Sequence, residues 1–275
     1  MSFEVFIPAT SAHLDSAECS VRRLIEQGID SDLITVVTPK AEDYHVFLGA
    51  YSIKVATDND RARFRVSDIS SALPVGLRDL SGWYFQQLLK YELVISSDRA
   101  NVLVIDADTI ILGNVFESLG VFGLSKERHA PYYEHYRLLM GAMPSIEKSA
   151  IVNFMWFNPA ALRGMLSFIE EKTGRVWWEA ILAVVKSEKH SNAEFSEYET
   201  YANWCVSQSL PNRCIDFHVF RRGDLLVGSH RNKNDVIAAM ALKGYGAVAF
   251  EHAHARSFWK IMMAHMIYFF SLKYW

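Results

Sequence analysis

The sequence predicts an α/β fold in which helices flank a mostly parallel central sheet. Short apolar runs that suit buried strands occur at residues 5–10, 33–38 and 101–106. Apolar residues at helical spacing fill the stretch between the first two runs and the stretch before the third. Buried strands that alternate with helices are typical of parallel sheets covered on both faces. Such sheets bind ligands at the carboxyl ends of their strands.

The N-terminal part of the chain forms the first predicted βαβ unit. Residues 5–10 make a strand that runs into a loop. A helical pattern over about 14–27 stops at Gly28, and the second strand, 33–38, is closed by Pro39. This spacing of strand, helix and strand predicts two neighbouring parallel strands.

Further elements follow along the chain. Residues 64–66 can form a short strand, and residues 80–93 carry a helical pattern just before the third apolar run. Pro159 ends the strand-like run 149–159 and opens a helix over 160–172.

Composition favours one large domain that does not bind nucleic-acid polymers. The chain has 275 residues, of which 51% are hydrophobic, so it can bury a substantial core. Its 28 Lys and Arg residues against 31 Asp and Glu give a formal charge of -3, which leaves no cationic excess for a polyanion. We expect one domain over residues 1–257 and a C-terminal aromatic-rich helix over residues 258–275.

The termini and the cysteines indicate a cytoplasmic protein. The N-terminus has no basic region followed by a long apolar run, so we expect no signal peptide. Cys19, Cys205 and Cys214 have no CxxC spacing and cannot all pair, so we expect buried thiols in a reducing compartment. The helix at 258–275 is short and charged for a membrane span. Two alternatives remain for it: docking on the domain core, or peripheral contact with the inner face of the cytoplasmic membrane.

Two carboxylates follow the best buried strand in the sequence. The apolar run 102–105 passes directly into Asp106, Ala107 and Asp108. Carboxylates this close repel each other, and Mn²⁺ or Mg²⁺ relieves the repulsion while keeping positions for diphosphate oxygens. The small side chain of Ala107 lets the backbone turn without crowding a ligand. The alternative is that both aspartates only cap the turn.

Four stretches of the chain resemble GT-A nucleotide-diphospho-sugar transferases, especially bacterial ones from polysaccharide and lipopolysaccharide loci. The resemblance extends from about residue 3 to residue 255, and its stretches are Phe6–Thr10, Ser81–Lys90, Ile105–Thr109 and Phe195–Asn203. It implies the GT-A form of the α/β fold. It also implies that Asp106 and Asp108 are a DxD metal motif, and that Pro8, Ala9 and Thr10 help to hold the nucleotide of a donor, most commonly a UDP-sugar.

A third metal ligand is also implied by the resemblance, because such enzymes often take one from a histidine near the end of the domain. His252 and His254 are the candidates, after the strand-like run 247–250. Residues two apart in an extended segment point to the same side, so the sequence leaves both open.

The predicted helix before the metal turn carries a polar face. Gln86 and Lys90 are four residues apart and therefore share one face, while Leu88 and Leu89 turn towards the core. We expect this face to meet the donor, with Lys90 neutralising a diphosphate or a sugar carboxylate. The alternative is a solvated helix surface.

Glu197 is the candidate catalytic base. Ser196 and Glu199 have the spacing of a capping box, so we expect the carboxylate of Glu199 to bond back to the N–H of Ser196. Glu197 is then left to point out of the helix. In GT-A enzymes that invert the anomeric centre, a carboxylate at such a position deprotonates the acceptor. Glu199 and Asp224 are the fallback candidates, and stabilisation of the helix dipole is the alternative role for Glu197.

Two other features have both a functional and a structural interpretation. The cationic patch could clamp a diphosphate or an anionic acceptor, or it could be a solvated loop; it comprises Arg221, Arg222, His230, Arg231 and Lys233. Trp177 and Trp178 could stack on sugar rings or pack in the core.

The sequence therefore predicts an inverting, metal-dependent glycosyltransferase that moves a sugar from a nucleotide-diphosphate sugar to a glycan or glycolipid acceptor in cell-surface polysaccharide synthesis. One alternative is a sugar nucleotidyltransferase, but the loop after the first strand lacks the glycines and basic residues of a phosphate loop. The other is a non-catalytic carbohydrate-binding or scaffold protein that has kept the GT-A fold.

Overall fold

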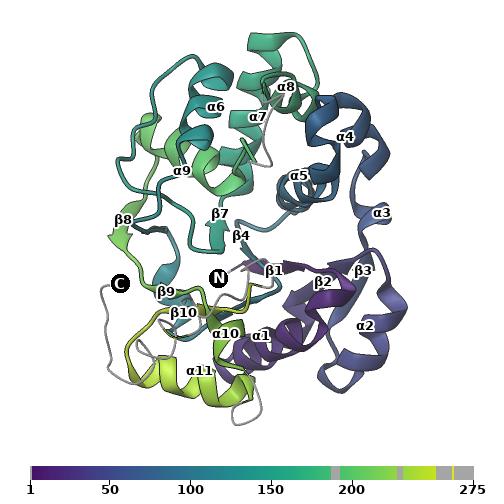
Figure 1. The fold of residues 1–275 in the computed structure, drawn as a ribbon, viewed down its shortest axis with the longest axis vertical. Coiled ribbons are helices and arrows are strands. Elements are labelled where there is room, and N and C mark those ends of the chain that lie inside the picture. The colour runs from purple at the N-terminus through teal and green to yellow at the C-terminus, as the bar shows by residue number, and fades with distance from the viewer. Residues whose placement is uncertain (1, 187–192, 228–231, 252–261, 263–275) are drawn as a thin grey trace.

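The computed structural model describes residues 2–186, 193–227, 232–251 and 262. A five-stranded sheet crosses the middle of the molecule, in the order β3-β2-β1-β4-β7 (Figure 1). Strands β3, β2, β1 and β4 are parallel, and β7 pairs antiparallel with β4. The strands are β1 (Phe3–Pro8), β2 (Ile34–Thr38), β3 (Lys54–Thr57), β4 (Asn101–Ile105) and β7 (Phe154–Phe157).

Two smaller sheets and the helices complete the described fold. The three-stranded sheet has the order β5-β10-β9, and β6 pairs with β8 in the two-stranded sheet. These strands are β5 (Thr109–Ile111), β6 (Val121–Leu124), β8 (Arg213–Asp216), β9 (Val219–Phe220) and β10 (Ala247–Ala249). The helices are α1 (Leu14–Glu26), α2 (Ala41–Leu48), α3 (Asp58–Arg61), α4 (Val66–Ala72), α5 (Ser81–Ile95), α6 (Ala130–Met140), α7 (Pro159–Thr173), α8 (Trp177–Ala183), α9 (Glu197–Ser207), α10 (Gly223–Leu226) and α11 (Lys233–Leu242).

Side chains of the central strands alternate between two cores. On β4, Val102 and Val104 pack into a cluster with residues of α4 to α9, whereas Leu103 and Ile105 pack into a second cluster that includes α1. The strand is therefore buried on both faces, as its uninterrupted apolar sequence predicts. This burial fixes the position of the chain at the end of β4, where the polar residues begin.

The predicted elements agree with the structure for β1, α1, β2, α5, β4 and α7. The predicted strand at 64–66 is wrong: Phe64 is a buried core residue between α3 and α4. The strand predicted over 149–159 is shorter and covers only β7, because the backbone of Asn153 takes a φ of 64°, which ends extended structure at that point.

Several sequence expectations concern residues outside the site. Cys19 and Cys205 are buried free thiols, but Cys214 is exposed on β8, so the expectation of buried thiols fails there. Trp177 packs in the core, against Phe64 and Tyr91, which favours its structural interpretation. No helix among the described residues is long and apolar enough to cross a membrane. The predicted helix at 258–275 lies outside the described residues, apart from residue 262.

Candidate active site

The turn formed by Asp106, Ala107 and Asp108 joins the central sheet to the three-stranded sheet. The N–H of Asp106 donates to the carbonyl oxygen of Asn153 at 2.9 Å, and the N–H of Thr109 closes the turn on the carbonyl oxygen of Asp106 at 2.9 Å. The N–H of Phe250 donates to the carbonyl oxygen of Asp108 at 2.8 Å. Neighbouring strands therefore hold the turn at both ends, and its conformation does not depend on the aspartate side chains alone.

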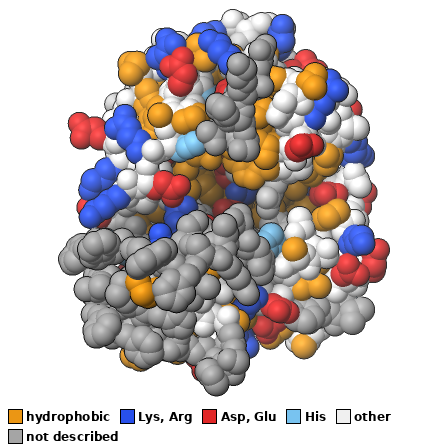
Figure 2. Space-filling model, viewed as in Figure 1, with side chains coloured by type: hydrophobic (Ala, Val, Ile, Leu, Met, Phe, Trp, Pro, Cys, Tyr) orange, Lys and Arg blue, Asp and Glu red, His pale blue; other side chains and the backbone are white. Residues whose placement is uncertain are grey.

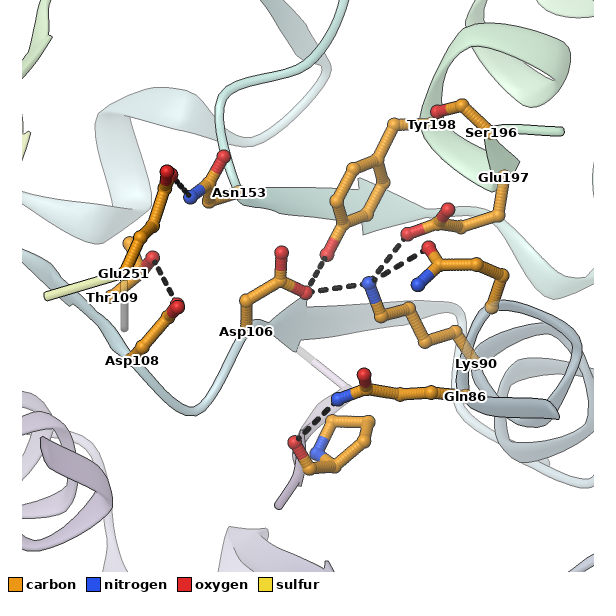
Figure 3. A network of polar contacts seen from close by, with 12 residues as sticks. Gln86, Lys90, Asp106, Asp108, Thr109, Asn153, Ser196, Glu197, Tyr198 and Glu251 are labelled. Atoms are coloured by element: carbon orange, nitrogen blue, oxygen red, sulfur yellow. Dashed lines mark hydrogen bonds and ion pairs between the residues drawn. The ribbon is translucent and has the colours of Figure 1, made fainter. Parts of the chain in front are cut away.

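One oxygen of the Asp106 carboxylate is held by protein groups. Lys90 Nζ lies 2.5 Å from Oδ1, and the hydroxyl of Tyr198 donates to the same oxygen at 3.0 Å (Figure 3). Among the described residues, no hydrogen bond or ion pair engages the other oxygen, Oδ2, which points away from Lys90 in Figure 3. The side chain is 26% exposed. Oδ2 is thus the oxygen available to a ligand.

Lys90 is fully buried between two carboxylates from different elements. Its Nζ is 2.5 Å from Asp106 Oδ1 and 2.5 Å from Glu197 Oε1, and the side-chain amide of Gln87 donates to the Glu197 carboxylate. Burial alone would lower the pKa of Lys90, but the charges of Asp106 and Glu197 outweigh it and raise the pKa to about 12. Lys90 is therefore a cation in the middle of the site.

Asp108 lies on the other side of the turn. The hydroxyl of Thr109 donates to its Oδ1 at 3.1 Å. Burial, and next the negative charge of Asp106, raise the pKa of the Asp108 carboxyl. A divalent cation gains most where the charge of one carboxylate is disfavoured by a neighbouring carboxylate.

The structure brings the predicted donor-binding residues together at the end of β1. The side chain of Gln86 donates to the carbonyl oxygen of Pro8 at 3.4 Å, and Ala9 is buried with its N–H bonded to Val37. Thr10 is exposed, and its carbonyl oxygen accepts the hydroxyl of Tyr44 at 2.6 Å. Because β1 and β4 are adjacent and parallel, this loop and the Asp106 turn share one edge of the sheet.

Two interpretations of polar side chains are wrong. The alternative of a solvated helix surface fails at Lys90, because its ammonium group is buried and engaged by the two carboxylates. Glu197 is not left to point out of its helix, since it is 1% exposed and bound to Lys90. Gln86, on the same face of α5, does point towards the end of β1, whereas Lys90 is covered by Glu197 and Tyr198 of α9.

The capping box at the start of α9 is only half formed. The Ser196 side chain accepts the N–H of Glu199 at 3.3 Å, as predicted. The carboxylate of Glu199 does not bond back to Ser196: its Oε1 accepts the hydroxyls of Ser149 and Tyr133. These longer-range donors replace the local one. Asp224, the other fallback base, is buried on α10.

The remaining predicted residues are partly outside the described chain. His252 and His254, the candidate third ligands, lie outside the described residues, and so do His230 and Arg231 of the cationic patch. The last described residue before the two candidates is Glu251, which accepts a hydrogen bond from the side chain of Asn153 at 3.0 Å. Within the described residues there is no group of three or more His, Cys, Asp or Glu side chains that could hold a metal ion.

Two members of the cationic patch have protein partners in the structure. Arg221 lies 2.8 Å from Glu127 and 3.7 Å from Glu251, and it donates to the carbonyl oxygen of Ile151. Lys233 donates to the hydroxyl of Ser16. The structure therefore gives these side chains protein partners, which favours their structural interpretation.

Sequence reasoning missed Tyr198 and Asn153. Tyr198 contacts Asp106 directly, and Asn153 contacts the turn through its carbonyl oxygen and Glu251 through its amide. A lone asparagine in an otherwise apolar run was the only sequence signal for Asn153.

Figure 2 shows that the middle of this face of the molecule is hollowed, with hydrophobic side chains around the hollow and charged atoms at its floor.

Comparisons with known proteins bear on the fold. No protein-family profile and no curated protein matches the sequence. The fold is similar to a crystal structure of the galactosyltransferase LgtC in complex with donor and acceptor sugar analogues, with a TM-score of 0.50 and 10% identity, over 96% of this chain and 95% of that chain. The bifunctional glycosyltransferase WbbM gives a TM-score of 0.44 and 12% identity, over 96% of this chain and 49% of that chain. The glycosyltransferase GlyE from Streptococcus pneumoniae TIGR4 gives a TM-score of 0.42 and 11% identity, over 99% of this chain and 64% of that chain. The likeness to LgtC, with the strand order of the central sheet, shows that the chain has the GT-A type of α/β fold.

Proposed function

We propose that the chain is a metal-dependent glycosyltransferase that moves a sugar from a nucleotide-diphosphate sugar to a glycan or glycolipid acceptor. The observation that carries this proposal is the position of Asp106 and Asp108, on a tight turn at the carboxyl end of β4, an inner strand of the central sheet. In a fold of this type that edge is the ligand-binding edge. The likeness to LgtC, a galactosyltransferase crystallised with donor and acceptor sugar analogues, supports the same class of chemistry.

The charges of the site fit a divalent cation. Two carboxylates, Asp106 and Glu197, contact the ammonium group of Lys90, and a third, Asp108, lies two residues after Asp106 on the turn. With all of them ionised the cluster carries two net negative charges, which one Mn²⁺ or Mg²⁺ balances. Carboxylate oxygens are the ligands that these hard cations prefer. His252 or His254 is the proposed third ligand.

Each part of the site has a proposed role in binding the donor. The cation, when bound, offsets the charge that develops on the departing nucleoside diphosphate. Asp106 and Asp108 hold that cation, and the loop Pro8 to Thr10, with Gln86 beside it, contacts the nucleotide. These groups lie at the ends of adjacent strands, so one extended donor can reach all of them.

Several finer points remain predictions from the sequence. They are a UDP-sugar as the donor, a role in cell-surface polysaccharide synthesis on the cytoplasmic side of the membrane, and inversion with Glu197 as the acceptor base. The last is tested by the anomeric configuration of the product, read by NMR. Inversion requires a base that can reach the acceptor hydroxyl, and Glu197 meets this requirement only if its carboxylate leaves Lys90.

Donor hydrolysis and sugar transfer test the proposed function. The purified protein is assayed with a panel of nucleotide sugars, with Mn²⁺ and with a chelator, and compared with Asp108→Asn. We expect turnover that needs the metal and that falls at least about 100-fold in Asp108→Asn, because metal charge stabilisation is worth several kcal/mol. Asp216→Asn is the matched control, since Asp216 is an exposed carboxylate on β8.

The same assay separates the alternatives. A nucleotidyltransferase would form a nucleotide sugar from a sugar phosphate and a nucleoside triphosphate. A non-catalytic protein would bind the donor, seen as a rise in melting temperature, without releasing nucleoside diphosphate. Either result would contradict the proposed function.

A further inference from the structure

The buried ion pair between Lys90 and Glu197 has a third member at the metal turn. Lys90 lies on α5 and Glu197 is the first residue of α9, and these two helices pack together. Both side chains are at most 2% exposed. Burying two charges is costly, and an apolar pair of similar volume often stabilises a fold as well or better. The packing of α5 on α9 therefore gives no reason for a charged pair.

The reason lies in the contact of Lys90 with Asp106. The same ammonium group that binds Glu197 also lies 2.5 Å from Asp106 Oδ1. Unlike the other two side chains, Asp106 is partly exposed and sits on the proposed metal turn. Lys90 and the hydroxyl of Tyr198 occupy Oδ1 together, so the carboxylate presents only Oδ2 to a ligand.

We infer, on the basis of the proposed function, that Glu197 and Lys90 are positioning residues that hold Asp106 so that it binds the cation through Oδ2 alone. Glu197 acts through Lys90 and is not the acceptor base. This assignment replaces the role that the sequence predicts for Glu197.

The charge balance explains why Glu197 is needed. A buried lysine with Asp106 as its single partner would cancel the charge that Asp106 offers to a cation. Glu197 shares the ammonium group at an equal distance of 2.5 Å. The contact with Lys90 therefore fixes Oδ1 without the ammonium group being matched to Asp106 alone. Partners of metal ligands commonly change metal affinity by about 10- to 100-fold when they are removed.

The surroundings of Glu197 are unsuited to proton abstraction from an acceptor. A general base must come within hydrogen-bond reach of the acceptor hydroxyl. Glu197 is 1% exposed, and Lys90 and Gln87 contact its carboxylate. To act as a base it would have to break the ion pair and leave Lys90 with Asp106 alone.

The variant Glu197→Gln separates the two roles. A positioning role predicts that the Kd for Mn²⁺, measured by isothermal titration, rises about tenfold or more, and that the donor KM rises with it. The value of kcat should then change by less than about threefold. A base role predicts the opposite split, with kcat lower by about 10²- to 10⁴-fold and Mn²⁺ binding unchanged. That second pattern would overturn the inference.

Glu92→Gln is the matched control. Glu92 is also a buried carboxylate, on the same helix as Lys90, and it pairs with Arg63 at 2.8 Å. Its loss should leave the Kd for Mn²⁺ at the wild-type value. A general effect of removing a buried carboxylate from this part of the fold would instead raise the Kd in both variants, and would count against the inference.

A double variant guards against simple unfolding. Lys90→Met combined with Glu197→Leu removes both charges, so neither is left buried without its partner. We expect this protein to fold, by circular dichroism, and to bind Mn²⁺ at least about tenfold more weakly than wild type. Wild-type Mn²⁺ affinity in a folded double variant would refute the positioning role alone. Absence of Mn²⁺ binding by the wild-type protein would refute the proposed function, and the inference with it.

Discussion

The hydroxyl of Tyr198 donates a hydrogen bond to Asp106 Oδ1, at 3.0 Å. Burial, and next the charge of Asp106, raise the pKa of Tyr198 well above its usual value, so the hydroxyl stays protonated and can only donate to the carboxylate. The ring of the same tyrosine packs near Phe157 and beneath the ammonium group of Lys90. Asp106 is thus oriented from α5 and α9 together, and not only by its own strand.

Tyr198→Phe is predicted to weaken Mn²⁺ binding while the fold is kept. The ring remains, so core packing is unchanged, but Asp106 loses one of the two groups that fix its Oδ1. A hydrogen bond to a charged group contributes about 1.5–3 kcal/mol. If all of this energy serves to orient Asp106 for the cation, its loss raises the Kd for Mn²⁺ roughly tenfold or more. Isothermal titration with Mn²⁺ measures this change.

Tyr201→Phe is the control for this prediction. The hydroxyl of Tyr201, also on α9, accepts the N–H of Asn158 at 2.8 Å and does not contact the turn. Its removal should lower the melting temperature without changing the Kd for Mn²⁺. Equal effects of the two variants on Mn²⁺ binding would contradict an orienting role for Tyr198.

Asn153 is predicted to be a conformational anchor of the turn. Its φ of 64° lies in the left-handed region, which asparagine tolerates better than most residues, and its carbonyl oxygen accepts the N–H of Asp106. Asn153→Gly keeps this conformation and loses only the side-chain bond to Glu251. Asn153→Ala loses the same bond and adds about 1–2 kcal/mol of backbone strain.

Urea unfolding of the two variants measures the strain term directly. We expect the free energy of unfolding of Asn153→Ala to be lower than that of Asn153→Gly by about 1 kcal/mol or more. Both variants lack the hydrogen bond to Glu251, so its contribution cancels in the difference between their free energies of unfolding. An alanine variant as stable as the glycine variant would show that the left-handed conformation at this position is not retained in solution.

Glu199 is predicted to make the protein less stable as the pH rises from acidic values. Burial raises the pKa of its carboxyl above the model-compound value of 4.5, and its Oε2 has no hydrogen-bond partner among the described residues. Because the folded state then binds more protons than the unfolded state, the contribution of this group to stability is fully present below pH 4.5 and is lost as the pH rises through the folded pKa.

Glu199→Gln removes this titration and keeps an oxygen to accept from Ser149 and Tyr133. We expect the variant to be at least as stable as wild type at pH 7 and to lose less stability between about pH 4.5 and neutrality. Melting temperatures measured across this range test the sign. A variant that is less stable than wild type at pH 7 but equal to it at low pH would contradict the prediction.

The sequence predicts the main strands and helices of the fold because each of them depends on a local pattern of apolar residues. The strands β1, β2 and β4 are uninterrupted apolar runs, and α1, α5 and α7 show apolar residues at helical spacing. The carboxylates at the end of β4 follow from the same pattern, since a buried strand that ends in polar residues delivers them to the edge of the sheet. The residue at which β7 begins could not be predicted from the sequence, because it is set by the positive φ of Asn153.

The partners of the polar side chains could not be predicted in the same way. Lys90 and Glu197 are 107 residues apart, and nothing local in either segment indicates that they meet. Helical spacing correctly places Gln86 and Lys90 towards the same side of α5, but it does not show that Glu197 of α9 binds Lys90 there. Glu199 likewise has a local partner available in Ser196, yet two distant hydroxyls from Ser149 and Tyr133 bind it instead.

The most direct test of the account is a crystal structure with Mn²⁺ and a nucleoside diphosphate, in which the ion is identified by its anomalous scattering. We predict an anomalous peak bonded to Asp106 through Oδ2 and to Asp108, with Lys90 still in contact with Oδ1. Density that shows both aspartates bonded to protein groups alone, with no ion at the turn, would contradict the central claim.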